Sequence, residues 1–170
     1  GIVYGRTEVI FEDSIKDNYV LKEGNLLPEG NIFSELAKEC FIVFSSSMVD
    51  KKKFHLVGGF PSNFSYATDY WIFLHLSRKY ECFALQEVCC KYRVHSSNLS
   101  NEKRTTAVKE SIDILENMQP NSEIILGLKH QYVSLLIESF KEKKYLDVFN
   151  ILIKKKVLLK LIERILKKLS

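Results

Sequence analysis

The stretch that decides the fold runs from Val57 to Ser100 and reads VGGFPSNFSYATDYWIFLHLSRKYECFALQEVCCKYRVHSSNLS. It opens with a Gly-Gly pair that breaks the chain sharply before Pro61. Side chains at helical spacing then predict a helix over residues 68–80. They are Tyr70, Phe73, Leu74, Ser77 and Tyr80. A run containing Phe83, Leu85, Val88 and Tyr92 follows, and we expect a pair of strands over residues 82–93.

Outward from this stretch, the N-terminal region mixes short strands with one helix. Ile2–Tyr4 and Thr7–Phe11 are short runs of apolar or β-branched residues and predict two strands. Asn31 stands where its side chain caps a helix that continues through Ala37. Phe41–Val49 is apolar and rich in serine, which fits either a buried strand or a short helix. Residues 1–100 therefore predict an α/β region.

The pattern changes after residue 101, where amphipathic helical repeats follow one another. Helices are predicted around residues 108–115, 125–140, 146–153 and 157–169, with Pro120 and Asn121 separating the first two. We expect one domain over residues 1–100 and an all-helical region over residues 101–170.

The composition is that of a globular protein with a substantial core, because 46% of the residues are hydrophobic and 27% are charged. No apolar run approaches the length of a membrane-spanning helix, and the first residues do not resemble a secretory signal. The four cysteines form no Cys-x-x-Cys pair and have no His at zinc-finger spacing. We therefore expect buried, reduced thiols in a cytoplasmic protein.

The positive charge of the chain is concentrated in its last 30 residues. Residues 141–170 hold ten Lys or Arg and three Asp or Glu, a net charge of +7, which leaves −3 for the other 140 residues. Two interpretations of residues 154–169 stay open. One is a basic amphipathic helix that lies on an anionic membrane surface, at the inner face of the membrane. The other is a charged outer face on a helix of a small bundle, which the apolar faces of the preceding helices favour.

Three motifs follow one another in the central stretch: Gly58–Phe60, Thr68–Trp71 and Tyr92–Ser100. Their order resembles the second half of the inverting GT-A glycosyltransferases of family 2. Those enzymes carry a Gly-Gly-Phe turn, an acidic helix start and a closing Tyr-Arg-x-His-x-x-x-x-Ser. Upstream, Ile2–Gly5 resembles the strand that follows the family's Asp-x-Asp motif, and Gly30–Phe33 resembles its Gly-x-Ile-Phe helix start. The resemblance covers roughly residues 1–100 and implies the C-terminal half of a GT-A fold, followed by a helical tail.

Asp69 matches the position of the family's catalytic base. Such a carboxylate takes the proton from an acceptor hydroxyl while that oxygen attacks the sugar. From the residues alone, Asp69 reads as a helix N-cap or a first-turn acid, and such a role is compatible with that of the base. The family often has Glu before this Asp and an acid two residues after it, whereas this chain has Thr68 and Trp71. These departures bear on acceptor recognition more than on the base.

The resemblance also implies contacts to the donor and to a metal ion. His95 matches the position that reaches the divalent metal or the donor diphosphate, and a neutral imidazole suits Mn²⁺. Arg93 fits diphosphate contact by its charge. The other candidates for substrate binding are Gly58, Gly59, Phe60, Thr68, Tyr70, Trp71 and Ser100.

Each of these candidates has a plainer alternative. His95 and Arg93 fit surface residues at the end of a strand, and the two glycines fit any tight turn. Tyr70 and Trp71 fit either a sugar-stacking wall or the core, and helical spacing favours the core for Tyr70.

The activity implied is inverting transfer of a sugar from a nucleotide-sugar donor to a glycan or lipid-linked acceptor, as in the biosynthesis of bacterial envelope polysaccharides. Mg²⁺ or Mn²⁺ would be bound mainly by an N-terminal half that ends in Asp-x-Asp. No Asp-x-Asp occurs in the 170 residues, so we expect this segment alone to have little or no activity. The alternative is a degenerate, non-catalytic transferase fold that binds a partner or a membrane through its helical tail.

Two further expectations concern partners. Nucleic acid is not an expected ligand, because the basic character belongs to the tail alone. Half of a sheet would expose a long edge and apolar surface, which a second copy of the chain would cover in a homodimer.

Overall fold

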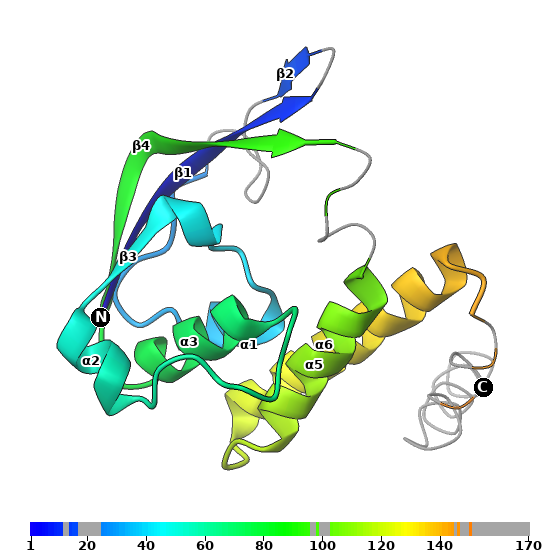
Figure 1. Cartoon of the computed structure of the whole chain (residues 1–170). Coiled ribbons are helices and arrows are strands. Elements are labelled where there is room, and N and C mark those ends of the chain that lie inside the picture. The colour runs from blue at the N-terminus through cyan, green and yellow to red at the C-terminus, as the bar shows by residue number, and fades with distance from the viewer. Residues whose placement is uncertain are drawn as a thin grey trace, which may run out of the picture. The chain divides into compact units, whose positions relative to one another are not determined.

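The computed structural model describes residues 1–11, 14–16, 25–95, 98, 103–144, 146 and 150. The chain divides into two compact units, Gly1–Gln131 and Tyr132–Ser170. Within the described residues there are four strands, five α-helices and one short 3₁₀-helix (Figure 1). The protein is thus a small α/β protein, as the sequence predicts at that level.

Strand β1 (Ile2–Phe11) lies at the centre of a mixed four-stranded sheet. Strand β4 (Cys82–Val94) runs parallel to it along its whole length. On the other side, β3 (Ser47–Val49) pairs antiparallel with the start of β1, and β2 (Ser14–Lys16) pairs antiparallel with its end. The parallel pair needs a long crossover, which the helices between the two strands supply.

The structure corrects two strand predictions. The two strands expected over residues 2–4 and 7–11 are one continuous strand, and the strand pair expected over residues 82–93 is one strand of 13 residues. The register between β1 and β4 shifts on both sides of Arg6, so bulges, and not turns, take up the irregular positions. Gly5 suits this position, because a Cβ atom there would clash with the side chain of Cys89 and lie 2.9 Å from its Cβ atom.

Helices α1 (Phe33–Lys38) and α3 (Thr68–Ser77) lie together on one side of the sheet (Figure 1). The predicted helices over residues 33–37 and 68–80 are therefore confirmed, although α3 ends at Ser77. Asn31 accepts a hydrogen bond from the Phe33 amide at 3.3 Å, just before α1 begins. The core between helices and sheet includes fully buried side chains from every layer, among them Ile2, Tyr4, Leu36, Phe73 and Leu115.

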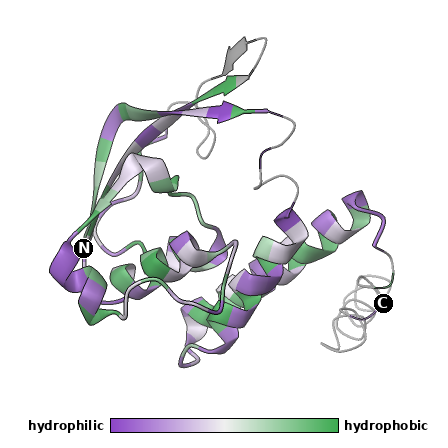
Figure 2. Ribbon diagram, in the orientation of Figure 1, coloured by the Kyte–Doolittle hydropathy of each residue, from purple (hydrophilic) through white to green (hydrophobic). Residues whose placement is uncertain are grey.

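The segment between α1 and α3 holds a short helix and a strand, but the strand is not buried as expected, because Met48 at its centre is 72% exposed. The 3₁₀-helix η1 (Phe44–Ser46) leads directly into β3. Helix α2 (Lys51–Leu56) follows and was not predicted, because its lysine-rich start carries no apolar stripe (Figure 2). Asp50 caps it by accepting a hydrogen bond from the Lys53 amide at 2.9 Å.

The compact first unit extends beyond residue 100. Helix α5 (Arg104–Glu116) buries Ile112, Ile114 and Leu115, and helix α6 (Ser122–Lys141) begins in the same unit. Both helices stand where the periodicity predicts them. Gln131 of α6 donates a hydrogen bond to the Lys38 carbonyl at 3.0 Å, which ties the first part of α6 to the end of α1.

The second unit contains the last turns of α6. The helix ends at Lys141, and Lys143 adopts a left-handed conformation with a φ of 58°. The Lys144 amide then donates to the Ser139 carbonyl at 2.8 Å, which closes the helix end. The two predicted helices beyond residue 145 and the basic segment 154–169 lie outside the described residues, apart from Leu146 and Asn150. No helix in the described part of the chain combines the length and apolarity that crossing a membrane requires.

Strand β4 forms an edge of the sheet in the described part of the chain. Gly30 pairs with it at Cys82 through two backbone hydrogen bonds of 2.7 and 2.8 Å, and beyond that bridge no described strand pairs with its outer side. Large exposed apolar side chains lie on β3 and β4; they are Met48, Phe83, Leu85 and Val88. The expected edge and apolar surface are therefore present.

All four cysteines are free thiols, as expected, but the expectation that all four are buried holds only in part. Cys82 is buried and Cys40 and Cys90 are half-buried, whereas Cys89 is exposed. Cys89 and Cys90 are neighbours on one strand, so the pleat turns their side chains to opposite faces.

Candidate functional site

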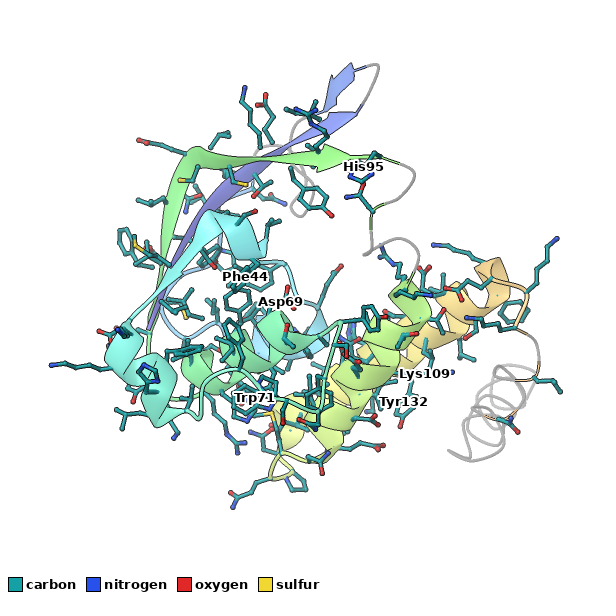
Figure 3. All side chains as sticks on the ribbon, viewed as in Figure 1. Phe44, Asp69, Trp71, His95, Lys109 and Tyr132 are labelled. Atoms are coloured by element: carbon teal, nitrogen blue, oxygen red, sulfur yellow. The ribbon has the colours of Figure 1, made fainter. Side chains whose placement is uncertain are left out.

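An open pocket of about 330 Å³ lies beside the start of α3. Its walls come from three separate segments: η1, the turn after α2, and the loop that leads into α3. The lining residues are Phe44, Phe60, Tyr66, Thr68 and Asp69. Three aromatic side chains thus line the pocket together with the Asp69 carboxylate and the Thr68 hydroxyl, and Figure 3 shows Phe44 close to Asp69.

The Gly58-Gly59 turn delivers Phe60 to this pocket. Both glycines have positive φ angles, 105° and 69°, which an L-residue with a side chain rarely adopts. Their amides donate to the carbonyls of His55 and Phe54 and so terminate α2. The Phe60 ring then packs edge-on against Phe54, with 5.0 Å between ring centroids. The predicted turn is confirmed, and it orients a pocket wall.

Asp69 lies in the first turn of α3. The N-cap residue of this helix is Ala67, so Asp69 is a first-turn acid and not the cap itself. One of its carboxylate oxygens, Oδ1, accepts a hydrogen bond from the Tyr70 amide at 2.7 Å. Burial raises the pKa of Asp69 above its ordinary value, and this effect outweighs the backbone hydrogen bonds that lower it.

Tyr70 and Trp71 do not line the pocket, although they follow Asp69 directly. Tyr70 is buried in the core, and its hydroxyl donates to the Ala37 carbonyl at 3.0 Å. Trp71 stacks on His75, with 3.8 Å between ring centroids and 19° between ring planes. Successive residues of a helix point about 100° apart, so only Thr68 and Asp69 of this motif reach the pocket.

Arg93 and His95 lie at the far end of the sheet, where β4 ends. Both side chains are exposed, and Figure 3 shows His95 well apart from Asp69. Asn98 organises this end of the strand, because its side chain accepts a hydrogen bond from the His95 amide and donates to the Arg93 carbonyl at 3.2 Å. Ser100 lies outside the described residues.

The described residues do not assemble a metal site. In the parts of the chain that the structure describes, no three His, Cys, Asp or Glu side chains gather closely enough to hold a metal ion. In this part of the chain His95 does not belong to a group of that kind. The prediction that such a cation is bound mainly by residues of a donor-binding half stays a prediction.

Three residues of this region were not singled out from the sequence. Phe44 and Tyr66 line the pocket, and Glu110 of α5 binds the loop that carries Tyr66. Phe44 lies in an apolar run, but nothing local relates that run to Asp69, 25 residues further along the chain. Glu110 has no local signal at all, since an acid on an amphipathic helix is ordinary.

The fold and the pocket define a class: a small α/β protein with a half-buried carboxylate at a helix start, facing an aromatic wall. No model of a known protein family matches the chain, and no curated protein sequence matches it.

The raised pKa of Asp69 leads to a prediction about stability. A group whose pKa is higher in the folded state binds protons more tightly there, so the free energy of unfolding falls as pH rises through the window above the ordinary Asp value of 3.8. The Asp69→Asn substitution removes this pH-dependent fall in the free energy of unfolding. We expect the variant to have the higher free energy of unfolding at neutral pH, with the difference disappearing in acid.

Urea denaturation of both proteins over a pH series measures this difference. The control is Asp50→Asn, which changes an exposed acid at a helix start where the pKa is lowered by a backbone hydrogen bond. A difference in the free energy of unfolding between Asp69→Asn and the wild type that does not grow as pH rises would contradict the raised pKa of Asp69.

Proposed function

We propose that residues 1–100 form the acceptor and catalytic-base side of an inverting family 2 glycosyltransferase. The observation that carries the proposal is the Asp69 carboxylate at an aromatic-walled pocket, at the position where the order of motifs puts the base. The Gly-Gly turn supports the proposal as well, because this second motif of the set places Phe60 at the same pocket.

The geometry suits proton removal from a sugar hydroxyl. The Tyr70 amide donates to Oδ1 of Asp69, and a carboxylate has acceptor positions on both oxygens, so it can also accept a hydrogen bond from an acceptor hydroxyl. Burial raises the pKa of the carboxyl, and a base whose pKa lies nearer the working pH is more effective. In this proposal Asp69 takes the proton while the acceptor oxygen attacks the anomeric carbon of the donor. The bond from that carbon to the diphosphate breaks, and the nucleoside diphosphate leaves with the bonding electrons.

The pocket suits a saccharide acceptor. Its volume of about 330 Å³ is at the small end of ligand sites, and it combines apolar walls with few polar groups. Phe44 and Phe60 offer ring surface to the apolar face of a sugar, while Thr68 and Asp69 offer hydrogen bonds to its hydroxyls. We therefore assign the glycan or the sugar of a lipid-linked acceptor to this pocket.

In this proposal, other residues than those of the pocket bind the nucleotide-sugar donor. The 170 residues contain no Asp-x-Asp, and the described part of the chain gathers no metal ligands. We propose that residues outside these 170 hold the nucleotide diphosphate and the divalent cation. Arg93 and His95 remain candidates for contact with that diphosphate.

The proposal is tested by titrating the isotope-labelled chain with two sets of ligands and following its amide resonances. One set contains short glycans and the other contains UDP-sugars with Mn²⁺. We expect a glycan to shift the amides around Tyr66 and Asp69, and UDP-sugars to have little effect. Phe60→Ala should weaken glycan binding by up to about tenfold through lost ring contact.

Phe83→Ala is the matched control, since Phe83 is 56% exposed and Phe60 is 54% exposed. It should leave glycan binding unchanged. If no glycan in the set shifts the pocket amides, the acceptor assignment fails. Metal-dependent UDP-sugar binding near Arg93 and His95 would instead show that this chain builds a donor site of its own.

A further inference from the structure

The Glu110 carboxylate accepts hydrogen bonds from three consecutive backbone amides. Its Oε2 atom accepts from Tyr66 and Ala67, both at 2.8 Å, and the Ser65 amide donates to both oxygens at 3.1 and 3.2 Å. Glu110 lies on α5, whereas the three amides belong to the loop that leads into α3. Successive amides that converge on one point form a binding site for an anion, and here the anion is a side chain of the same protein.

The loop depends on this carboxylate, because the start of α3 has no cap of its own. Ala67, the N-cap residue, has no side-chain oxygen and makes no capping bond. Glu110 also places a negative charge near the N-terminus of α3, where the helix dipole favours it. The position of Glu110 is secured in turn by α5, which buries Ile112, Ile114 and Leu115.

The position of two pocket walls depends on the segment that Glu110 binds. Tyr66 donates its amide to Glu110 and lines the pocket with its side chain. Ala67 is followed directly by Thr68 and Asp69, the polar residues of the pocket. A shift of the loop would therefore move an aromatic wall and the carboxylate together.

We propose that Glu110 is a positioning residue. Through the amides of residues 65–67 it holds Tyr66 and Asp69 in place relative to Phe44 and Phe60, the other residues that line the pocket. This inference rests on the proposed function. It adds to it a residue outside the stretch that resembles the glycosyltransferase family. Glu110 does not touch the substrate. It acts by holding the loop of residues 65–67 in place before the start of α3.

If Glu110 holds the loop in place, it also limits the access of water to the Asp69 carboxylate. Burial raises the pKa of Asp69. When the loop loosens, water reaches the carboxylate, and its pKa returns toward the ordinary value. A residue that merely supported the fold would leave this titration unchanged in a variant that still folds.

The test uses Glu110→Gln and Glu110→Ala in the whole chain, with Glu116→Gln as the matched control. Glu116 is an exposed acid on the same helix, so its substitution changes the charge of α5 equally. Three quantities are measured: the amide chemical shifts of Tyr66 and Ala67, the titration of Asp69 followed by carbon NMR, and the glycan dissociation constant.

We expect both Glu110 variants to shift the two amide resonances, to lower the pKa of Asp69 and to weaken glycan binding, with Gln intermediate. Formate should partly restore all three in Glu110→Ala, because the anion can occupy the vacated amide site. In a transferase that contains this segment, misplacement of the base should reduce the catalytic rate by as much as about 10²-fold.

Wild-type amide shifts, Asp69 titration and glycan affinity in Glu110→Gln would overturn the positioning role. That outcome would leave the proposed function standing, because the function is tested by glycan binding to the wild type and by Asp69→Asn. Conversely, a wild-type chain that binds no glycan would end the proposed function, while the amide shifts and the titration would still decide whether Glu110 holds the loop.

Discussion

Asp69→Asn should lower sugar transfer by about 10²- to 10⁴-fold, the usual contribution of a positioned general base, and leave the fold intact. The amide of Asn cannot take the proton of an acceptor hydroxyl. Its oxygen can still accept the hydrogen bond that Asp69 receives from the Tyr70 amide, so the start of α3 is preserved. The rate of transfer is measured in a transferase that contains this segment together with its donor-binding half.

Asp50→Asn is the control for this experiment. Asp50 is also an acid at a helix start that accepts a backbone hydrogen bond, but it caps α2 and does not line the pocket. The Asp50→Asn variant should transfer sugar at the wild-type rate. Wild-type turnover by Asp69→Asn would remove Asp69 as the base. If the wild type binds glycan but transfers nothing from any donor, the chain is a non-catalytic module of the same fold.

Gly127→Ala should destabilise the protein by about 1–3 kcal/mol, the usual cost of overpacking a core. In the interior of a helix this substitution ordinarily stabilises by roughly 1 kcal/mol, so the expected sign is reversed. The reason is that α6 passes very close to α1 at this point. A Cβ atom on Gly127 would lie 2.5 Å from the Ala37 carbonyl oxygen and 2.9 Å from its carbon.

The effect should spread beyond the contact itself. The Ala37 carbonyl that would have to move also accepts the hydroxyl of Tyr70, the residue after Asp69. The free energy of unfolding is measured by urea denaturation, with Lys129→Ala as an exposed control on the same helix. Stabilisation by Gly127→Ala would mean that the first part of α6 does not pack on α1 as described.

Local sequence signals predicted the elements that carry the site, because each of those signals acts over a few residues. Helical periodicity predicted α3, α5 and α6, although α3 ends three residues earlier than expected. The Gly-Gly pair predicted a sharp turn, since only glycine adopts the positive φ angles at both positions without strain. Helix α2 was missed, because three lysines at its start hide the pattern.

The sequence pattern wrongly predicted breaks in β1 and β4, which are each one continuous strand. A bulge and a turn both interrupt the alternation of apolar residues, so the interruption near Gly5 and Arg6 looked like a break between strands. Pairing with β4 carries β1 through that position, and the two strands stay parallel over their full length.

By itself, the sequence determined α1 and α3 of the crossover, the Gly-Gly turn and the place of Asp69 at the start of α3, because periodicity, turn chemistry and helix starts are local properties. Only the tertiary structure decided which side chains face Asp69. Tyr70 and Trp71, next to it in sequence, point elsewhere, whereas Phe44 reaches the pocket from η1. Glu110 meets its amide partners 43 to 45 positions along the chain, and hydrogen bonds over such separations leave no trace in a single sequence.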